Sequence, residues 1–174
     1  MITPSSPSTP PVVSIIAKSG TGKTTFIEKL IPELRRSGLR VGVLKHHSHD
    51  SPFDIPGKDT YRIAQAGAEV VVGASAVQTA VFIQQSGSED LDATIARFLA
   101  DMDIVLTEGY KRGRYPKIEV HRAARSLELL CTPAELLLLV TDEPLDLPTP
   151  QFGLDDAAGV ATWLADWLQL DVGV

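Results

Sequence analysis

The sequence predicts a single α/β domain of three layers, with a mainly parallel sheet and helices on both of its faces. Three observations lead to this fold class. A loop of small residues joins an apolar run to a helical pattern near the start of the chain, later apolar runs end in isolated polar residues, and helical patterns separate the runs. In such folds a ligand binds at the carboxyl ends of the strands.

The chain begins with a proline-rich stretch and is acidic overall. Residues 1–11 contain four prolines and predict a flexible tail ahead of one domain, residues 12–174. The net charge of −6 argues against a nucleic-acid partner. We expect no membrane association, because no apolar stretch reaches the length of a membrane span or a signal sequence. The single cysteine, Cys131, predicts a buried thiol in a cytoplasmic protein.

A glycine-rich loop follows the apolar run of residues 12–16 and opens a helix. Its backbone amides, the helix dipole and the charge of Lys23 would meet at one point, which suits a nucleotide polyphosphate. The loop matches G-x-x-x-x-G-K-[ST] except for Ala17, which serves where the backbone keeps a negative φ. In this pattern Lys23 binds the β- and γ-phosphates and the Thr24 hydroxyl holds Mg²⁺, as in a phosphate-loop NTPase. The alternative is a turn that only joins a strand to a helix. The predicted nucleotide contacts are Ser19, Gly20, Thr21, Gly22, Lys23, Thr24 and Thr25.

The helix after this loop should run to Gly38, with a bend rather than a break at Pro32. The next strand, residues 40–45, leads directly into His46-His47-Ser48-His49-Asp50. In extended backbone His47 and His49 share one face.

Three interpretations of this histidine stretch stay open. A zinc site would use His47, His49 and Asp50, but no second cluster completes tetrahedral coordination. The favoured interpretation is a loop that faces phosphate or Mg²⁺, in which Asp50 or Asp54 orders metal-bound water and the histidines donate to anionic oxygens. The third is an exposed polar loop without a function.

The middle of the chain predicts a short helix, two strands and a longer helix. Asp59 should cap the short helix, and Lys58 at its start is a candidate phosphate contact. The runs at 69–73 and 76–84 are so close in sequence that they should be neighbouring or antiparallel strands. The helical pattern of residues 89–100 follows.

A buried strand at residues 103–108 ends in one carboxylate, Glu108, followed by Gly109. Phosphate-loop proteins place at this point the acid that orients Mg²⁺ and its waters. The alternative is a solvated glutamate at a strand end.

Residues 110–125 hold six basic side chains and only one acidic one. We expect the part from Lys111 to Lys117 to bind a second phosphorylated ligand or an acidic partner, unless it is only a solvated surface. The alternating pattern of residues 117–122 predicts a strand at a sheet edge.

The last predicted strand, residues 134–142, ends in Asp142. The chain contains no asparagine, so the Asn-Lys-x-Asp motif of many GTPases is absent. A carboxylate accepts from N1–H and N2–H of guanine together, so Asp142 would select guanine; the alternative is an aspartate that only starts a turn. A helix with Trp163 and Trp167 in the core ends the chain.

Five stretches together resemble the molybdopterin-guanine dinucleotide biosynthesis protein B family. The histidine stretch followed by Pro-Gly-Lys-Asp and Glu-Gly-Tyr-Lys is much narrower than a phosphate loop alone. The resemblance extends over nearly the whole chain after the tail. The stretches are Gly20–Thr25, Lys45–Asp50, Pro56–Thr60, Thr107–Lys111 and Val140–Asp142.

This resemblance implies a dimeric GTP-binding adaptor with weak GTPase activity. It would assist the molybdenum cofactor guanylyltransferase, which attaches GMP to molybdopterin. Lys23, Thr24 and Glu108 match the family's nucleotide and Mg²⁺ positions. The histidine loop and the basic segment are carried over only as contacts to molybdopterin phosphate or to the partner. The predicted catalytic residues are thus Lys23 and Glu108, the metal ligands Thr24, Asp50 and Glu108, and the further ligand contacts His47, His49, Lys58, Lys111 and Asp142.

Two rival functions share the phosphate loop. A small-molecule kinase would use the basic segment to hold its acceptor, and a GTP-dependent metallochaperone would use the histidines to carry a metal such as nickel. Without a glutamine or arginine clearly directed at the γ-phosphate we expect slow turnover, which suits an adaptor.

Overall fold

The computed structural model describes residues 9–46, 52–84, 87, 90–126 and 128–171. It divides the chain into two compact units, each described here by itself. The first is formed by the residues up to position 46 and from position 92 onward, and the second by residues 47–91. The described part of the chain contains no helix with the length and apolar character that a membrane crossing requires.

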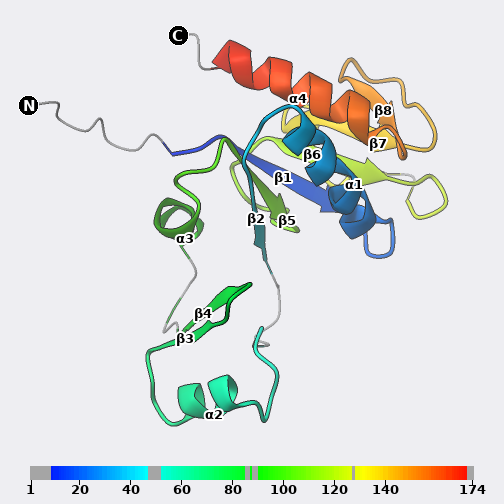
Figure 1. Ribbon diagram of the computed structural model, residues 1–174. Helices are drawn as coiled ribbons and strands as arrows, with labels where there is room; N and C mark the ends of the chain where they lie inside the picture. Colours follow the sequence, from blue (N-terminus) through cyan, green and yellow to red (C-terminus); the bar gives the residue numbers. More distant parts are fainter. Residues whose placement is uncertain (1–8, 47–51, 85–86, 88–89, 127, 172–174) are drawn as a thin grey trace, which may run out of the picture. The chain divides into compact units, whose positions relative to one another are not determined.

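The first unit is built on a six-stranded sheet with the order β2-β5-β1-β6-β7-β8, in which every pairing is parallel (Figure 1). The predicted fold class is therefore confirmed. The carboxyl ends of the parallel strands meet at one edge, where the phosphate loop also lies. The strands are β1 (Val12–Ala17), β2 (Val41–Lys45), β5 (Ile104–Glu108), β6 (Lys117–His121), β7 (Leu136–Thr141) and β8 (Gln151–Gly153).

Helices cover both faces of this sheet. On one face α1 (Lys23–Arg36) and α4 (Ala157–Asp171) pack their apolar sides on alternate residues of the strands, and Leu30, Leu34 and Leu164 are fully buried there. Helix α1 continues through Pro32, as predicted. On the other face α3 (Leu91–Phe98) and the residues after it pack on the sheet, where Leu99 and Met102 lie over Gly42.

The second face of the sheet carries buried polar side chains. Ser14 and Thr107 share a hydrogen bond of 2.8 Å between β1 and β5. On β6 the alternating polar residues Lys117, Glu119 and His121 are all buried. The prediction that residues 117–122 form an edge strand is wrong, because β6 lies between β1 and β7. Polar and apolar residues alternate along β6 because its polar side chains make hydrogen bonds inside the protein, and not because one side of the strand faces solvent.

Cys131 is half-buried, whereas the sequence predicted a buried thiol. Its Sγ donates to the buried Glu119 carboxylate at 3.5 Å. Burial, together with the adjacent Glu119, raises the pKa of the Cys131 thiol to about 12. Burial also raises the pKa of Glu119, against the hydrogen bonds that it accepts from Leu130 and Cys131.

The Cys131 thiol is expected to react slowly with alkylating reagents, because only the thiolate attacks them. At pH 8 the native protein should react with iodoacetamide more slowly than the urea-unfolded chain by a factor on the order of 100 to 1000, as the raised pKa requires. Mass spectrometry of timed samples measures both rates. Equal rates in the two states would contradict the raised pKa.

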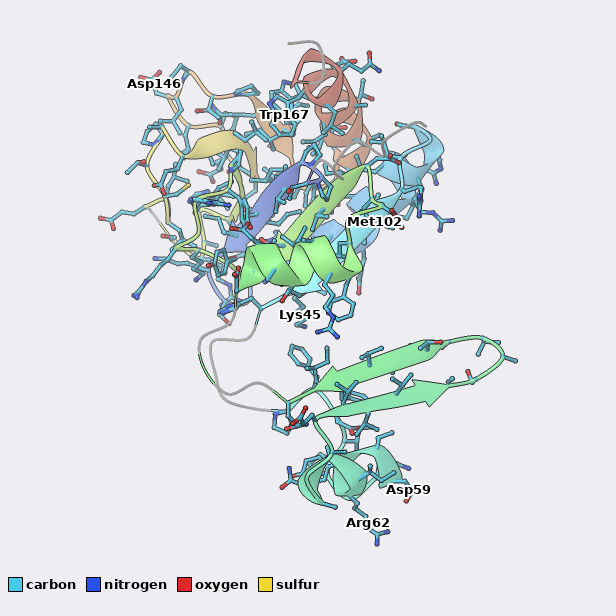
Figure 2. The ribbon with its side chains drawn as sticks, turned by 90° about the vertical axis from the view of Figure 1, so that its left-hand side faces the viewer. Lys45, Asp59, Arg62, Met102, Asp146 and Trp167 are labelled. Atoms are coloured by element: carbon cyan, nitrogen blue, oxygen red, sulfur yellow. The ribbon has the colours of Figure 1, made fainter. Side chains whose placement is uncertain are left out.

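The second unit holds an antiparallel hairpin and a short helix (Figure 2). Strands β3 (Val70–Ala74) and β4 (Thr79–Ile83) pair with each other in antiparallel orientation, which confirms their predicted pairing. Helix α2 (Asp59–Gln65) packs against β3. Its N-cap is Lys58 and not Asp59, which instead lies in the first turn, where the helix dipole favours a carboxylate.

Candidate functional site

The phosphate loop lies between the end of β1 and the start of α1. Gly20 and Gly22 have φ values of 74° and 99°, in the left-handed region where side chains are disfavoured. Both the N–H and the Oγ1 of Thr21 donate to the carbonyl of Lys18, which closes the loop on itself. Every positive φ in the described part of the chain belongs to a glycine, so Ala17 fits the backbone condition that the sequence set for it.

Lys23, Thr24 and Glu108 meet at the start of α1. Glu108 ends β5, which pairs with β1, so its side chain comes to the loop. Its Oε1 accepts from Lys23 Nζ at 2.9 Å and from Thr24 Oγ1 at 2.7 Å. The three residues that the sequence assigned to phosphate and metal are thus brought together.

The electrostatic environment keeps Glu108 ionised. Burial alone would raise its pKa, since only 8% of the residue is exposed. The hydrogen bonds from Lys23 and Thr24, with the charges of Lys23 and Lys45, outweigh burial and lower the pKa below its ordinary value. A carboxylate that stays charged near neutral pH suits a role next to a cation.

Lys45 is a member of this cluster that the sequence analysis did not assign. Its Nζ lies 3.6 Å from Glu108 Oε2, because Lys45 and Glu108 are register partners on the adjacent strands β2 and β5. The signal was present, since both residues end apolar runs, but the pairing of the two strands was needed to connect them.

Two arginines of the basic segment lie beside the loop. Arg122 Nε donates to the carbonyl oxygen of Thr21 at 2.8 Å. A methyl group added to Gly20 would lie 3.6 Å from the guanidinium carbon of Arg125. Both arginines belong to the predicted basic segment, but their position beside the loop depends on β6 lying next to β1.

Asp142 follows β7 at the same edge of the sheet. It is exposed, and its Oδ1 accepts from the backbone N–H of Ala123 at 2.9 Å. Asp142 is thereby linked to the turn that carries Arg122 and Arg125. Its predicted role in reading guanine stays a prediction.

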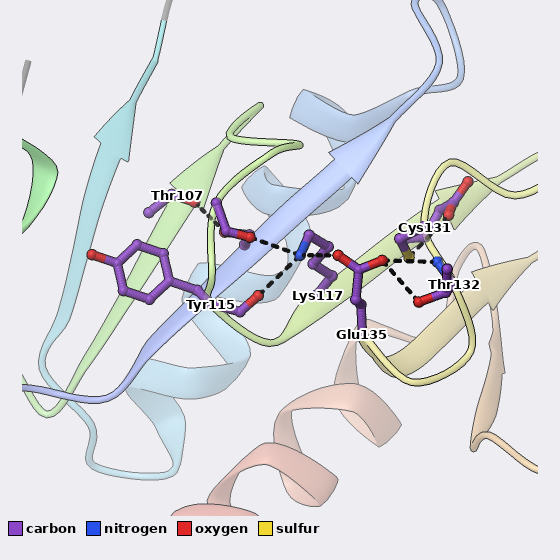
Figure 3. A network of polar contacts seen from close by, with 9 residues as sticks. Thr107, Tyr115, Lys117, Cys131, Thr132 and Glu135 are labelled. Carbon is purple, nitrogen blue, oxygen red and sulfur yellow. Dashed lines mark hydrogen bonds and ion pairs between the residues drawn. The ribbon is translucent and has the colours of Figure 1, made fainter. Parts of the chain in front are cut away.

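The basic segment is not one anion-binding surface. Lys111 is exposed, but Lys117 is almost fully buried and lies 3.0 Å from Glu135 (Figure 3). Its Nζ also donates to the carbonyl of Gly113 at 2.8 Å and to that of Tyr115 at 3.4 Å. Lys117 is therefore a structural residue, and the expectation that it binds a second anion is wrong.

The remaining predicted contacts lie elsewhere. Lys58 belongs to the second unit. His47, His49 and Asp50 lie outside the described residues. Within the described ranges no three His, Cys, Asp or Glu side chains gather as a metal site would require. Ser19 and Thr25 are exposed on either side of the loop's glycines.

Comparison with known proteins identifies the family. The MobB family model, described as molybdopterin guanine dinucleotide synthesis protein B, matches residues 12–142. The chain belongs to this family. Two MobB relatives, both described as molybdopterin-guanine dinucleotide biosynthesis adapter proteins, are similar over most of the chain. The one from Escherichia coli is 34% identical over 94% of this chain and 96% of its own length. The one from Haemophilus influenzae is 33% identical over 91% and 89%.

A solved structure agrees with this assignment. The crystal structure of a molybdopterin-guanine biosynthesis protein B (MobB) superimposes with a TM-score of 0.69 at 31% identity, over 90% of this chain and 99% of that one. The family match includes the phosphate loop, Glu108, Arg122 and Asp142. The candidate site therefore lies entirely within the part of the chain that defines a MobB protein.

Proposed function

We propose that this MobB protein binds GTP and Mg²⁺ at the phosphate loop, hydrolyses GTP weakly, and serves as an adaptor in molybdopterin-guanine dinucleotide synthesis. The adaptor role follows from the names of its relatives over nearly their whole length. The observation that carries the nucleotide proposal is the meeting of Lys23, Thr24 and Glu108 at the start of α1.

The oxygen ligands of this cluster fit Mg²⁺. A hydroxyl and a carboxylate are the hard oxygen donors that this ion prefers. Thr24 Oγ1 and Glu108 Oε1 are 2.7 Å apart. Adjacent ligands of an octahedral ion with bonds of 2.0–2.1 Å lie about 2.9 Å apart, so the two atoms need little rearrangement to act together. The ion would neutralise charge on the β- and γ-phosphates.

The protein's own groups supply binding more than chemistry. Loop amides and Lys23 would hold the phosphates. The hydrogen bond from Thr24 Oγ1 would keep the Glu108 carboxylate in position. Glu108 Oε1 is held by Lys23 and Thr24, and the lowered pKa makes this carboxylate a weak general base. Slow hydrolysis is the expected consequence, and it fits an adaptor.

The partner and the second ligand follow from the same function. We propose that the partner is the molybdenum cofactor guanylyltransferase, and that molybdopterin contacts exposed cationic residues such as Lys111. A cytoplasmic location is consistent with the free Cys131 thiol.

We also propose a homodimer, because the second unit exposes large apolar side chains on both strands of its hairpin, among them Val70, Val72 and Val81.

Isothermal titration with GTP, ATP and inorganic triphosphate, with and without Mg²⁺, tests the proposal. GTP should bind more tightly than ATP, and Mg²⁺ should strengthen both. Product analysis by phosphate release separates weak hydrolysis from a kinase, which would yield a phosphorylated acceptor. Light scattering measures the molar mass of the protein alone, which tests the dimer. The same measurement after the guanylyltransferase is added tests the adaptor role. If none of the three ligands binds, the proposal is contradicted.

A further inference from the structure

The peptide between Thr21 and Gly22 is held by a residue outside the loop. Its carbonyl accepts from Arg122 Nε at 2.8 Å. The C=O and N–H of a trans peptide point in opposite directions, so the Gly22 N–H is directed away from Arg122. Among the described residues the Gly22 N–H has no hydrogen-bond acceptor within the protein. The direction of this donor therefore depends on what holds the Thr21 carbonyl.

Glycine makes this peptide easy to rotate. Gly22 has a φ of 99°, and glycine populates positive and negative φ with similar ease. Rotation of the Thr21–Gly22 plane would exchange the positions of its carbonyl and its N–H, and would present an oxygen where an anion needs a donor. Arg122 opposes this rotation, because its guanidinium has no acceptor and pairs only with the carbonyl.

Arg122 is itself fixed by the end of a neighbouring strand. The backbone N–H of Ala123, the next residue, donates to Asp142 Oδ1 at 2.9 Å. The N–H groups of Arg125 and Ser126 donate to the Arg122 carbonyl at 2.9 and 3.2 Å, which closes the turn. The ends of β6 and β7 thus determine the position of the arginine that holds the loop after β1.

We propose that Arg122 is a positioning residue for the phosphate loop and that Asp142 holds Arg122 in place. The inference rests on the proposed function, in which the loop binds a polyphosphate. It gives Asp142 a role that does not depend on the base. Arg122 orients the Gly22 N–H toward the phosphates, and Asp142 acts on phosphate affinity through the turn at Ala123.

Inorganic triphosphate is the appropriate probe, because it has no base and no ribose. Arg122→Ala should bind it about ten- to a hundredfold more weakly than the wild type, the range for losing a hydrogen bond from a charged donor. Arg122→Lys should recover part of the affinity, since a lysine still donates. Arg125→Ala is the matched control. It removes the same charge from the same turn, but in the described structure the Arg125 side chain makes no hydrogen bond to the loop, so it should lose only the attraction of its charge and be weakened clearly less than Arg122→Ala.

The Asp142 variants test the second link independently. Asp142→Asn keeps an oxygen that accepts from Ala123 N–H and should bind triphosphate as the wild type does. Asp142→Ala removes the acceptor and should weaken binding in the same direction as Arg122→Ala. A residue that only reads guanine would leave triphosphate affinity unchanged in both variants. Thermal unfolding of each variant checks that the fold is retained.

The Gly22 amide gives a direct spectroscopic readout. In ¹H–¹⁵N spectra its proton resonance should move downfield when triphosphate is added to the wild type, and should move much less in Arg122→Ala. Triphosphate affinity unchanged in Arg122→Ala, or reduced equally in Arg125→Ala, would overturn this inference while leaving the nucleotide site intact. A wild type that binds neither triphosphate nor GTP would overturn both proposals.

Discussion

Lys23→Ala is expected to weaken the binding of GTP by about a hundredfold or more. Each hydrogen bond from a charged donor contributes about 1.5–3 kcal/mol, and Lys23 would serve two phosphates. Its Nζ also lies 2.9 Å from Glu108, so its removal leaves that carboxylate with Lys45 at 3.6 Å but without its nearer positive partner. Because Lys23 lowers the pKa of Glu108 through a hydrogen bond and through its charge, that pKa should rise in the variant. Isothermal titration in Mg²⁺ measures the affinity.

Lys29→Ala is the matched control for this substitution. Lys29 lies on the same helix and pairs with Asp155 at 2.6 Å, and the Lys29 side chain is about half-exposed while that of Asp155 is almost fully exposed. Removing it should change the affinity for GTP less than about twofold, because exposed pairs contribute little. If Lys23→Ala binds GTP as tightly as Lys29→Ala does, the assignment of the loop is wrong.

Lys117→Ala is expected to cause a large loss of stability. Lys117 is 1% exposed, and its ammonium group satisfies two backbone carbonyls and Glu135 at once (Figure 3). Removing one partner of a fully buried ion pair costs about 3–5 kcal/mol. Since Glu135 is half-exposed and solvent can compensate its charge, we expect a smaller loss of about 2–4 kcal/mol, or roughly 4–16 °C in the midpoint of thermal unfolding.

Lys111→Ala and Lys117→Met separate three possible causes of a stability loss: a missing charge in the basic segment, missing buried volume, and missing hydrogen bonds. Lys111 is exposed in the same basic segment, so its replacement should leave the unfolding midpoint within about 1 °C. Methionine at position 117 restores apolar volume but not the hydrogen bonds, so its stability should lie between those of the wild type and the alanine variant. Wild-type stability in Lys117→Ala would show that the buried network contributes nothing.

The acid dependence of stability gives a second measurement of this pair. Hydrogen bonds from Thr132, followed by the contact with Lys117, lower the pKa of Glu135 from 4.5 to about 2. A lowered carboxyl pKa contributes stability that is fully present above pH about 4.5 and is lost as the pH falls toward 2. Without Lys117 the folded-state pKa moves closer to the unfolded value. The variant should therefore lose less additional stability over this pH range than the wild type does.

The positions of β1, β5 and β7 and the chemistry at their ends were predictable from the sequence. Each strand is a continuous apolar run, because parallel strands are buried on both faces. Polar residues that interrupt such runs at their carboxyl ends point to the ligand-binding edge. Glu108 was found in this way, and its meeting with Lys23 follows from the pairing of β1 with β5.

The position of β6 was not predictable in the same way. Its alternating pattern is typical of a half-exposed strand, yet every residue of β6 is buried. Lys117 pairs with Glu135 and Glu119 accepts from the backbone of Leu130, which are 18 and 11 residues away along the chain, and no local pattern reports such contacts. The charge contrast of the basic segment likewise did not show that Lys117 is buried or that Arg122 contacts the phosphate loop.

By itself the sequence determined the phosphate loop, its lysine and hydroxyl, the acid at the end of β5 and the parallel α/β fold. The loop is recognised from a motif of a few consecutive residues, and the strands and helices from the spacing of apolar residues. Both signals are local in the sequence. Only the tertiary structure decided that Arg122 contacts the Thr21 carbonyl, that Asp142 fixes the turn of Arg122, and that Lys117 is buried. Those facts arise from the order of strands in the sheet, which is set by contacts between residues far apart in the chain.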